Sequence, residues 1–174
     1  MYTINKETEA KTMRKWPLLP ILFFGMLLGF FTSPAQATHL EDVQCLAENI
    51  YFEARSESTA GRVAVALVTL NRVEHTNFPD TVCGVVKQTK YYPSGRIDLH
   101  SCQFSWYCDG KSDEPTENCW EEILTLASVM LGWESSDVTD GALWYHSKKV
   151  NPTWADHYVQ TISIDNHIFY KALD

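Results

Sequence analysis

The sequence lacks an excess of positive charge. Its 174 residues include 14 Lys and Arg against 22 Asp and Glu, which gives a formal net charge of −8 at pH 7. A protein that binds nucleic acid normally presents a basic surface, because many of its contacts neutralise phosphate groups. The composition therefore argues against a nucleic-acid partner.

Common zinc-binding patterns are also missing. The chain has no H-E-x-x-H motif and no pair of cysteines separated by two residues, and the spacing Cys102-x5-Cys108 is not that of a usual zinc site. Three of the six histidines, His146, His157 and His167, fall in the last third of the chain. Lone histidines beside aromatic residues are usually structural, so the sequence predicts neither a metal nor a cofactor.

A hydrophobic run of full membrane-spanning length is lacking as well. The apolar run Trp16–Phe31 is short for a transmembrane helix and contains Pro17 and Pro20. Basic residues precede it and an A-x-A sequence follows it, which is the layout of a secretory signal peptide. We therefore predict a signal peptide at 1–37, with a retained membrane anchor as the alternative, and a single exported domain at 38–174.

Export places the protein in the periplasm or outside the cell. Without residues 1–37 the chain keeps 10 basic and 20 acidic residues, a net charge of about −10. All five cysteines lie in this part: Cys45, Cys83, Cys102, Cys108 and Cys119. An oxidising compartment favours disulfides, and an odd number leaves one cysteine unpaired. Pairing is open at this stage, although Cys102 and Cys108 could staple the long loop 90–115.

The hydrophobic pattern predicts helices first and a small sheet late, with no internal repeat. Helices are expected at 38–55, 61–75, 79–88 and 118–132, and strands at 142–147 and 159–172. Residues 56–59 break the first helix and cap the second. The last segment reads as a hairpin that turns at Asp165-Asn166. The fold class is therefore α+β, mostly helical with a small β-hairpin element.

The stretch CLAENIYFEARSES, residues 45–58, places a carboxylate on an apolar helix face. Leu46, Ile50 and Glu53 are spaced i, i+4 and i+7 and so share one face. A carboxylate there is costly unless it is paired or protonated. Glu53 is thus either a buried ion-pair partner or an acid with a raised pKa. Three arginines are candidate partners for such an ion pair: Arg55, Arg62 and Arg72.

Seven segments in chain order carry a resemblance to a known family. They are NIYFEARSES, GRVAVALVTLNRV, FPDTVCGVV, CQFSWYCDG, LWYHS, NPTW and NHIFY. Together they resemble the spore cortex-lytic enzyme and cell-wall hydrolase family. The resemblance implies an enzyme that degrades peptidoglycan, with a lysozyme-like fold related to lytic transglycosylases, and it assigns the catalytic glutamate to Glu53.

Two further expectations depend on this resemblance. Cys119 lies outside the matching motifs, so we predict that it is the unpaired cysteine. The family usually has Gly before the final Asn-His pair, whereas this chain has Asp165. The departure concerns the geometry of the hairpin turn rather than the acid.

Cleavage of a glycosidic bond requires an acid that stays protonated near neutral pH. Burial and the negative end of a helix dipole both raise the pKa of Glu53. A hydrolase also needs a second carboxylate, for which three residues are candidates: Glu57, Asp109 and Glu114. A lytic transglycosylase needs only one glutamate, because the 6-hydroxyl of N-acetylmuramic acid attacks its own anomeric carbon. We predict this second route, acting between N-acetylmuramic acid and N-acetylglucosamine.

The predicted partner is the glycan strand of peptidoglycan, bound by a monomer. Aromatic rings cover the flat faces of sugars, and polar side chains bond their hydroxyl and acetamido groups. We predict that five residues line the groove: Gln103, Ser105, Trp106, Tyr145 and His146. A metal-dependent N-acetylmuramoyl-L-alanine amidase and a non-catalytic cell-wall binding module are the alternatives. Glu53→Gln abolishes turnover in a glycan-cleaving enzyme but leaves binding by a module intact, whereas sensitivity to a chelator indicates the amidase.

Overall fold

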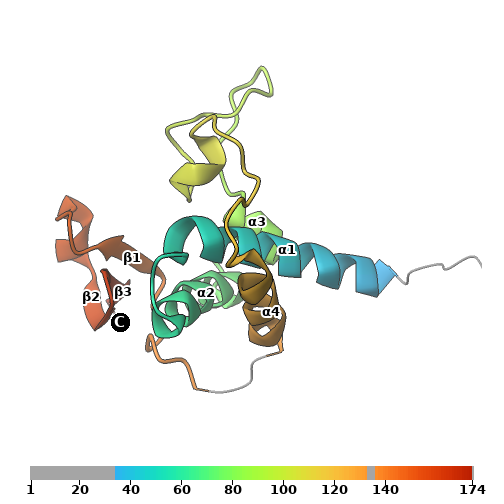
Figure 1. The fold of residues 1–174 in the computed structure, drawn as a ribbon. Coiled ribbons are helices and arrows are strands. Elements are labelled where there is room, and N and C mark those ends of the chain that lie inside the picture. Colours follow the sequence, from blue (N-terminus) through green and yellow to red (C-terminus); the bar gives the residue numbers. More distant parts are fainter. Residues whose placement is uncertain (1–33, 133–135, 174) are drawn as a thin grey trace, which may run out of the picture. The chain divides into compact units, whose positions relative to one another are not determined.

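The computed structural model describes residues 34–132 and 136–173 (Figure 1). The predicted signal peptide lies outside this range except for its last four residues, which begin the first helix. Within the described part, no helix is long and apolar enough to cross a membrane. The described elements are helices followed by a small antiparallel sheet, which confirms the predicted α+β class.

The helical part is organised around α1 (Pro34–Ala54), which contacts α2 (Thr59–Glu74), α3 (Val82–Val86) and α4 (Trp120–Leu131). In Figure 1, α2 and α4 lie beside α1. Leu46 and Ile50 of α1 are fully buried in the core that these helices share, together with Ile123 of α4. The valine-rich segment α2 is helical because both sides of it are packed, so burial outweighs the weak helix preference of valine.

Polar caps set the starts of α2 and α3. Ser58 Oγ accepts a hydrogen bond from the backbone N–H of Gly61, and Thr81 Oγ1 accepts one from the N–H of Gly84 at 3.1 Å. These bonds satisfy amide groups that have no partner within the first helical turn. The break predicted at residues 56–59 is therefore confirmed.

The sheet contains β1 (Trp144–Ser147), β2 (Val159–Ile164) and β3 (His167–Lys171) in the spatial order β1-β3-β2. Both pairings are antiparallel. Phe169 of the central strand β3 is fully buried and packs against Ala64 and Val68 of α2. This contact fixes the sheet against the helical part and sets the position of β1.

The hairpin between β2 and β3 turns at Asp165, whose φ of 48° lies in the left-handed region. Aspartate tolerates this region better than most residues, so the predicted hairpin forms without glycine. The Asp165 Oδ2 atom accepts hydrogen bonds from Ser58 N at 2.9 Å and Ser58 Oγ at 2.6 Å. Glu57 accepts a bond from the backbone N–H of Asn166 at 3.1 Å. The hairpin tip is thus bound to the corner between α1 and α2.

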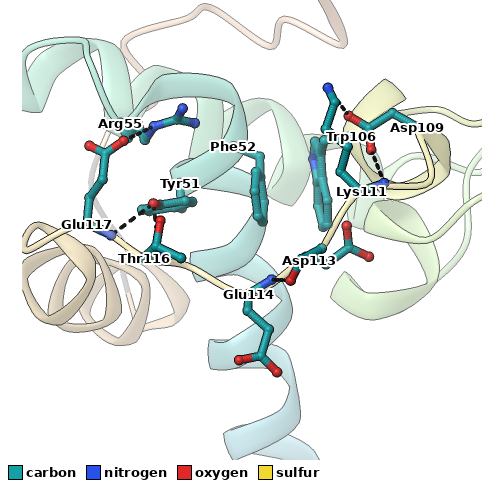
Figure 2. A pocket seen from close by; sticks show the side chains of 11 residues that line it. Tyr51, Phe52, Arg55, Trp106, Asp109, Lys111, Asp113, Glu114, Thr116 and Glu117 are labelled. Carbon is teal, nitrogen blue, oxygen red and sulfur yellow. Dashed lines mark hydrogen bonds and ion pairs between the residues drawn. The ribbon is translucent and has the colours of Figure 1, made fainter.

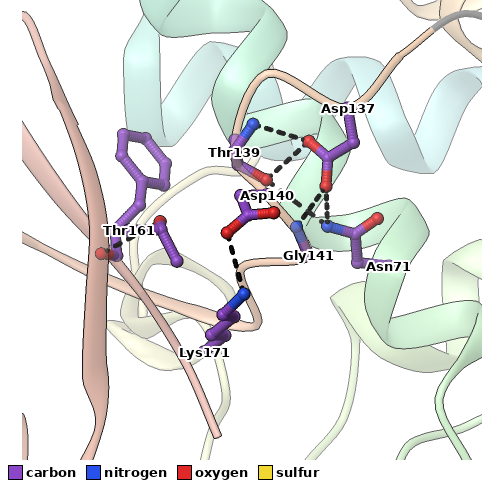
Figure 3. Close-up of polar contacts among 8 residues, drawn as sticks. Asn71, Asp137, Thr139, Asp140, Gly141, Thr161 and Lys171 are labelled. Carbon is purple, nitrogen blue, oxygen red and sulfur yellow. Dashed lines mark hydrogen bonds and ion pairs between the residues drawn. The ribbon is translucent and has the colours of Figure 1, made fainter.

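A second polar cluster connects α2 to the segment that leads into β1 (Figure 3). Asn71 Nδ2 donates to Asp137 Oδ2 at 2.8 Å and to the carbonyl of Ala142 at 3.1 Å. Asp137 also accepts bonds from the backbone N–H groups of Thr139 and Gly141, both at 2.7 Å. Burial acts to raise the pKa of the Asp137 carboxyl, but these bonds and one from the Thr139 hydroxyl, at 2.7 Å, together lower it. They hold the entry into β1 beside the C-terminal half of α2.

Two disulfides cross-link the described residues. Cys45–Cys83 links α1 to α3. Cys102–Cys108 closes a loop, residues 102–108, that contains the short 3-10 helix η1 (Ser105–Cys108) and is called the disulfide-closed loop below. Cys119 is half-buried and unpaired. The predicted staple and the predicted unpaired cysteine are both confirmed.

Candidate active site

Glu53 is the penultimate residue of α1 and lines a cavity of about 310 Å³. The cavity is lined by four parts of the chain: the end of α1, Arg72 of α2, the disulfide-closed loop, and the sheet edge with the 3-10 helix η2 (Thr153–His157). Its other lining residues are Arg72, Cys102, Gln103, Phe104, Ser105, Trp144, Tyr145 and Trp154. The fold therefore gathers residues from positions 53 to 154 of the chain around one carboxyl group.

The environment of Glu53 favours its protonated form. Burial raises the pKa of the Glu53 carboxyl, while a hydrogen bond from Tyr145 and the positive charge of Arg72 partly oppose the rise. The bond runs from the Tyr145 hydroxyl to Glu53 Oε2 and is 3.1 Å long. Burial raises the pKa of Tyr145, and so do the negative charge of Glu53 and the hydrogen bond to it. The Tyr145 hydroxyl therefore stays protonated and acts as a donor.

The ion-pair interpretation of Glu53 does not hold for two of the three candidate arginines. Arg55 pairs with Glu117 at 2.8 Å, and Arg62 pairs with Glu122 at 3.0 Å. Arg72 lines the same cavity as Glu53, and its positive charge acts on Glu53 from a distance longer than that of an ion pair. The described residues place no cation within ion-pair distance of Glu53. The half-buried carboxyl therefore has no direct counter-ion among the described residues.

Three of the residues predicted to bind sugar meet at this cavity. Gln103 and Ser105 come from the disulfide-closed loop, and Tyr145 comes from β1. Gln103 is positioned by a backbone bond from its N–H to the carbonyl of Gln88 at 2.9 Å. The side chains of Trp144 and Trp154 add aromatic walls. A polar and aromatic lining of this kind suits a carbohydrate.

Trp106, predicted in the same group, lies elsewhere. The residue is 8% exposed, and its indole stacks on Phe52 with ring centroids 4.6 Å apart. Its Nε1–H donates to Asn49 Oδ1 at 3.2 Å. The ring lines a second cavity, of about 460 Å³, beside the acidic segment 109–117 (Figure 2). Because Trp106 follows Ser105 in a tight 3-10 turn, the two side chains point into different cavities.

His146 also does not line the Glu53 cavity. It follows Tyr145 in β1, and successive side chains of a strand point to opposite faces. His146 Nε2 lies 2.9 Å from the hydroxyl of Tyr170, and its ring packs edge-on against Trp154. The part of the chain that the structure describes contains no group of three or more His, Cys, Asp or Glu that could hold a metal ion.

Arg72, Trp144 and Trp154 line the cavity but were not predicted as site residues. Arg72 is 3% exposed and comes from the apolar helix α2, so it carries the same signal as Glu53, a charge on a buried face. Burial lowers its pKa to about 10. The sequence pattern indicated Arg72 only as a candidate ion-pair partner. The two tryptophans gave no periodic signal that could separate a cavity wall from the core.

None of the three candidate second carboxylates lines the Glu53 cavity. Glu57 binds the hairpin residue Asn166, with an Oε1 to Nδ2 distance of 3.1 Å. Asp109 pairs with Lys111 at 3.0 Å, and Glu114 lines the second cavity. Glu53 is thus the only carboxylate among the described residues that line its cavity.

The chain is similar in sequence to known proteins of the bacterial cell wall. A family model described as Cell Wall Hydrolase matches residues 56–170, and the chain belongs to this family. Curated relatives include the spore cortex-lytic enzymes of Oceanobacillus iheyensis and Bacillus cereus. Each is 33% identical over 134 residues, which are 75% of this chain and 41% and 44% of the respective relatives. The chain therefore spans less than half the length of these relatives.

Two solved structures resemble the fold. One is the catalytic domain of the germination-specific lytic transglycosylase SleB from Bacillus anthracis, with a TM-score of 0.56, 31% identity and coverage of 75% of this chain and 93% of that one. The other is the catalytic domain of the Bacillus cereus SleB protein, with a TM-score of 0.53, 32% identity and coverage of 75% and 89%. The predicted family and its fold are confirmed.

Proposed function

We propose that this chain cleaves the glycan strands of peptidoglycan between N-acetylmuramic acid and N-acetylglucosamine, as a lytic transglycosylase with Glu53 as its acid and base. Membership of the cell-wall hydrolase family supports an enzyme of this substrate class, and the likeness to a lytic transglycosylase domain supports the reaction type. We further propose that the chain acts as an exported monomer in the cell envelope, in agreement with its two disulfides.

The observation that carries the proposal is the solitary position of Glu53. Glu53 is half-buried, its burial raises its pKa, and no second carboxylate among the described residues shares its cavity. Glycosidases that use water as nucleophile ordinarily need two carboxylates about the scissile bond. A single glutamate suffices when the nucleophile belongs to the substrate itself.

The proposed reaction has two proton transfers through one carboxyl group. Protonated Glu53 gives its proton to the glycosidic oxygen, and the bond between this oxygen and the anomeric carbon of N-acetylmuramic acid breaks. The 6-hydroxyl of the same sugar bonds to that carbon and returns its proton to Glu53. The products are a 1,6-anhydro end and a free 4-hydroxyl on N-acetylglucosamine, and the enzyme recovers its starting state.

Tyr145 and Arg72 support the intermediate state of this cycle. Both lower the pKa of Glu53, which means that both stabilise the carboxylate that remains after the first transfer. Burial acts in the opposite direction and keeps the proton on the acid beforehand. The balance suits a group that must give up a proton and take it back within one turnover.

Mass spectrometry of the soluble products tests the proposal directly. The full chain is incubated with isolated peptidoglycan, beside a Glu53→Gln variant and a matched Glu48→Gln variant. Glu48 lies in the same helix and accepts a hydrogen bond from Gln44 outside the cavity. We expect anhydro-muramic products from the native chain and the Glu48 variant and none from the Glu53 variant.

The other outcomes separate the alternatives. Reducing ends in place of anhydro ends would retain Glu53 as the acid but replace the internal nucleophile with water. Released peptides from intact glycan, unaffected by the Glu53 substitution, would indicate an amidase and contradict the proposal. Binding without any turnover in the native chain would indicate a cell-wall binding module.

A further inference from the structure

Arg72 is a buried cation whose hydrogen-bonding capacity is largely unused. Its side chain lines the Glu53 cavity, and the residue is 3% exposed. Its Nε–H donates to the carbonyl of Leu143 at 2.7 Å, and Nη1 is buried without a partner among the described residues. A buried guanidinium is costly when its N–H groups lack acceptors. Its retention in a cavity therefore points to an acceptor supplied by a ligand.

The surroundings of Arg72 restrict how a ligand can reach it. The rings of Phe78 and Phe104 lie against the guanidinium, with their centroids 5.3 and 5.2 Å from Cζ. These rings leave little room beside the guanidinium carbon, and the carbonyl of Leu143 occupies its Nε edge. The N–H groups that remain are those at the Nη end, which donate in the plane of the guanidinium. An oxygen with an in-plane lone pair, such as a carbonyl oxygen, suits this geometry.

The guanidinium is also held in place before any ligand arrives. Leu143, which accepts from Nε, donates its own N–H to the carbonyl of Tyr170 in β3 at 2.9 Å. Arg72 is therefore attached to α2 through its backbone and to the sheet through its side chain. A donor fixed at both ends loses little conformational entropy when it binds. The same attachments fix its position relative to Glu53, whose hydroxyl partner Tyr145 lies two residues after Leu143.

We infer that Arg72 is a substrate-binding residue whose Nη groups donate to an amide carbonyl oxygen of the glycan and so hold the sugar against Glu53. The inference rests on the proposed function for the identity of the substrate. Two amides of peptidoglycan have the required chemistry, the acetamido group at C2 of each sugar and the amide that joins the lactyl group to the peptide. Arg72 thereby selects glycans that carry an amide beside the scissile bond.

An Arg72→Lys variant of the full chain tests this role, because lysine keeps the charge near Glu53 but lacks the planar pair of Nη donors. Its kcat and KM are measured on intact peptidoglycan, on N-deacetylated peptidoglycan and on glycan freed of peptide. We expect kcat/KM on intact strands to fall about tenfold, the size of a lost charged hydrogen bond. On the substrate that lacks the recognised amide, the native and variant chains should differ little. The alkaline limb of the pH profile should stay in place, since the charge is retained.

The comparison between substrates decides the outcome. The inference is supported if the native and variant chains differ in kcat/KM on intact strands but not on one of the two altered substrates. The altered substrate on which they agree then identifies the amide that Arg72 binds. Loss of the same factor on all three substrates would overturn it, because a merely structural arginine would affect every glycan alike. N-deacetylation adds an ammonium group, but both enzymes carry a positive charge at position 72, so its repulsion largely cancels in the ratio.

Arg62→Lys provides a matched control. Arg62 lies in the same helix α2, its side chain is 12% exposed, and its Nη groups bind Glu122 and the carbonyl of Arg55 outside the cavity. We expect this variant to lose some thermal stability and to keep the same preference among the three substrates. It therefore reports the cost of exchanging a largely buried arginine in this helix.

A binding measurement tests Arg72 even where the lysine variant does not fold. In the Glu53→Gln chain, side-chain N–H resonances of Arg72 are followed by NMR during titration with a β-1,4-linked trimer of N-acetylglucosamine. The corresponding trimer of glucose, which is neutral and has no amide, is the control ligand. We expect the Arg72 resonances to shift with the first trimer only. If the amide-bearing trimer binds saturably and these resonances do not move, the inference is wrong for the acetamido group. The same titration with a muramoyl-peptide then tests the lactyl amide, and unchanged resonances there as well would overturn the inference. Because no turnover is needed, failure here is distinct from failure of the proposed reaction.

Discussion

The hydroxyl of Tyr145 in β1 donates a hydrogen bond to Glu53 Oε2 in α1 over 3.1 Å, although 92 residues separate them. This bond joins the sheet to the end of the first helix at the point where the chemistry is proposed to occur. It exists because Phe169 and the hairpin tip dock the sheet on α2 and on the corner between α1 and α2.

Replacement of Tyr145 by Phe should raise the pKa of Glu53 further, because the lost bond stabilises the carboxylate form. The acid must be protonated to start the reaction, so activity falls as the pH rises through this pKa. We expect the alkaline limb of kcat/KM to move to higher pH in the variant. The measurement is a pH profile of glycan cleavage. A limb that moves to lower pH would contradict the assignment of Tyr145 as donor to Glu53.

Glu53→Gln should stabilise the folded chain near neutral pH. The pKa of Glu53 is raised on folding, so the folded state keeps a proton that the unfolded state releases. The contribution of this proton to stability is fully present below pH 4.5, the ordinary pKa of glutamate in an unfolded chain. It is lost as the pH rises through the pKa of Glu53 in the folded chain. We therefore expect the variant to have a higher Tm than the native chain at pH 7 to 8 and little difference at pH 4. Equal gains at both pH values would show that the effect is not one of titration.

Trp106→Phe should lower stability more than activity. The substitution removes the indole N–H that bonds Asn49 Oδ1, an acceptor in a residue that is fully buried. Leaving such an acceptor unpaired costs about 1–3 kcal/mol. Denaturant unfolding measures this loss, and turnover of soluble glycan at low temperature measures activity. A large rise in KM with unchanged stability would instead restore Trp106 as a sugar-binding residue.

Asp165 should make stability fall in acid. Hydrogen bonds from Ser58 hold the pKa of the Asp165 carboxyl below its usual value. The contribution of the ionised carboxylate to stability is fully present above pH 3.8, the ordinary pKa of aspartate in an unfolded chain. It is lost as the pH falls through the pKa of Asp165 in the folded chain. We expect asparagine to tolerate the positive φ of the turn, so Asp165→Asn should have a flatter dependence of Tm on acidic pH.

Asp165→Ala should be less stable than Asp165→Gly, since alanine adds strain at the positive φ of position 165. The reverse order would show that the turn conformation does not limit the hairpin.

Local patterns in the sequence determined the helices and the hairpin, and together with the resemblance to the family they led to the prediction that Glu53 is the acid. Leu46, Ile50 and Glu53 share a helix face because helical spacing is a property of neighbouring residues, and a carboxylate on an apolar face indicates either a buried ion pair or a raised pKa. The same reasoning applied to Arg72 in α2 would have identified a second buried charge. The disulfide-closed loop and the unpaired Cys119 also followed from the sequence and its resemblance to the family.

Only the tertiary structure decided which side chains share a cavity. Neighbours in sequence were separated, as Ser105 was from Trp106 and Tyr145 from His146, because a tight turn and a strand direct successive side chains to different sides. Residues far apart were brought together when α2 buried Phe169 and placed the sheet edge beside Glu53. Such contacts depend on packing between elements, and the periodicity of a single segment carries no information about its partner.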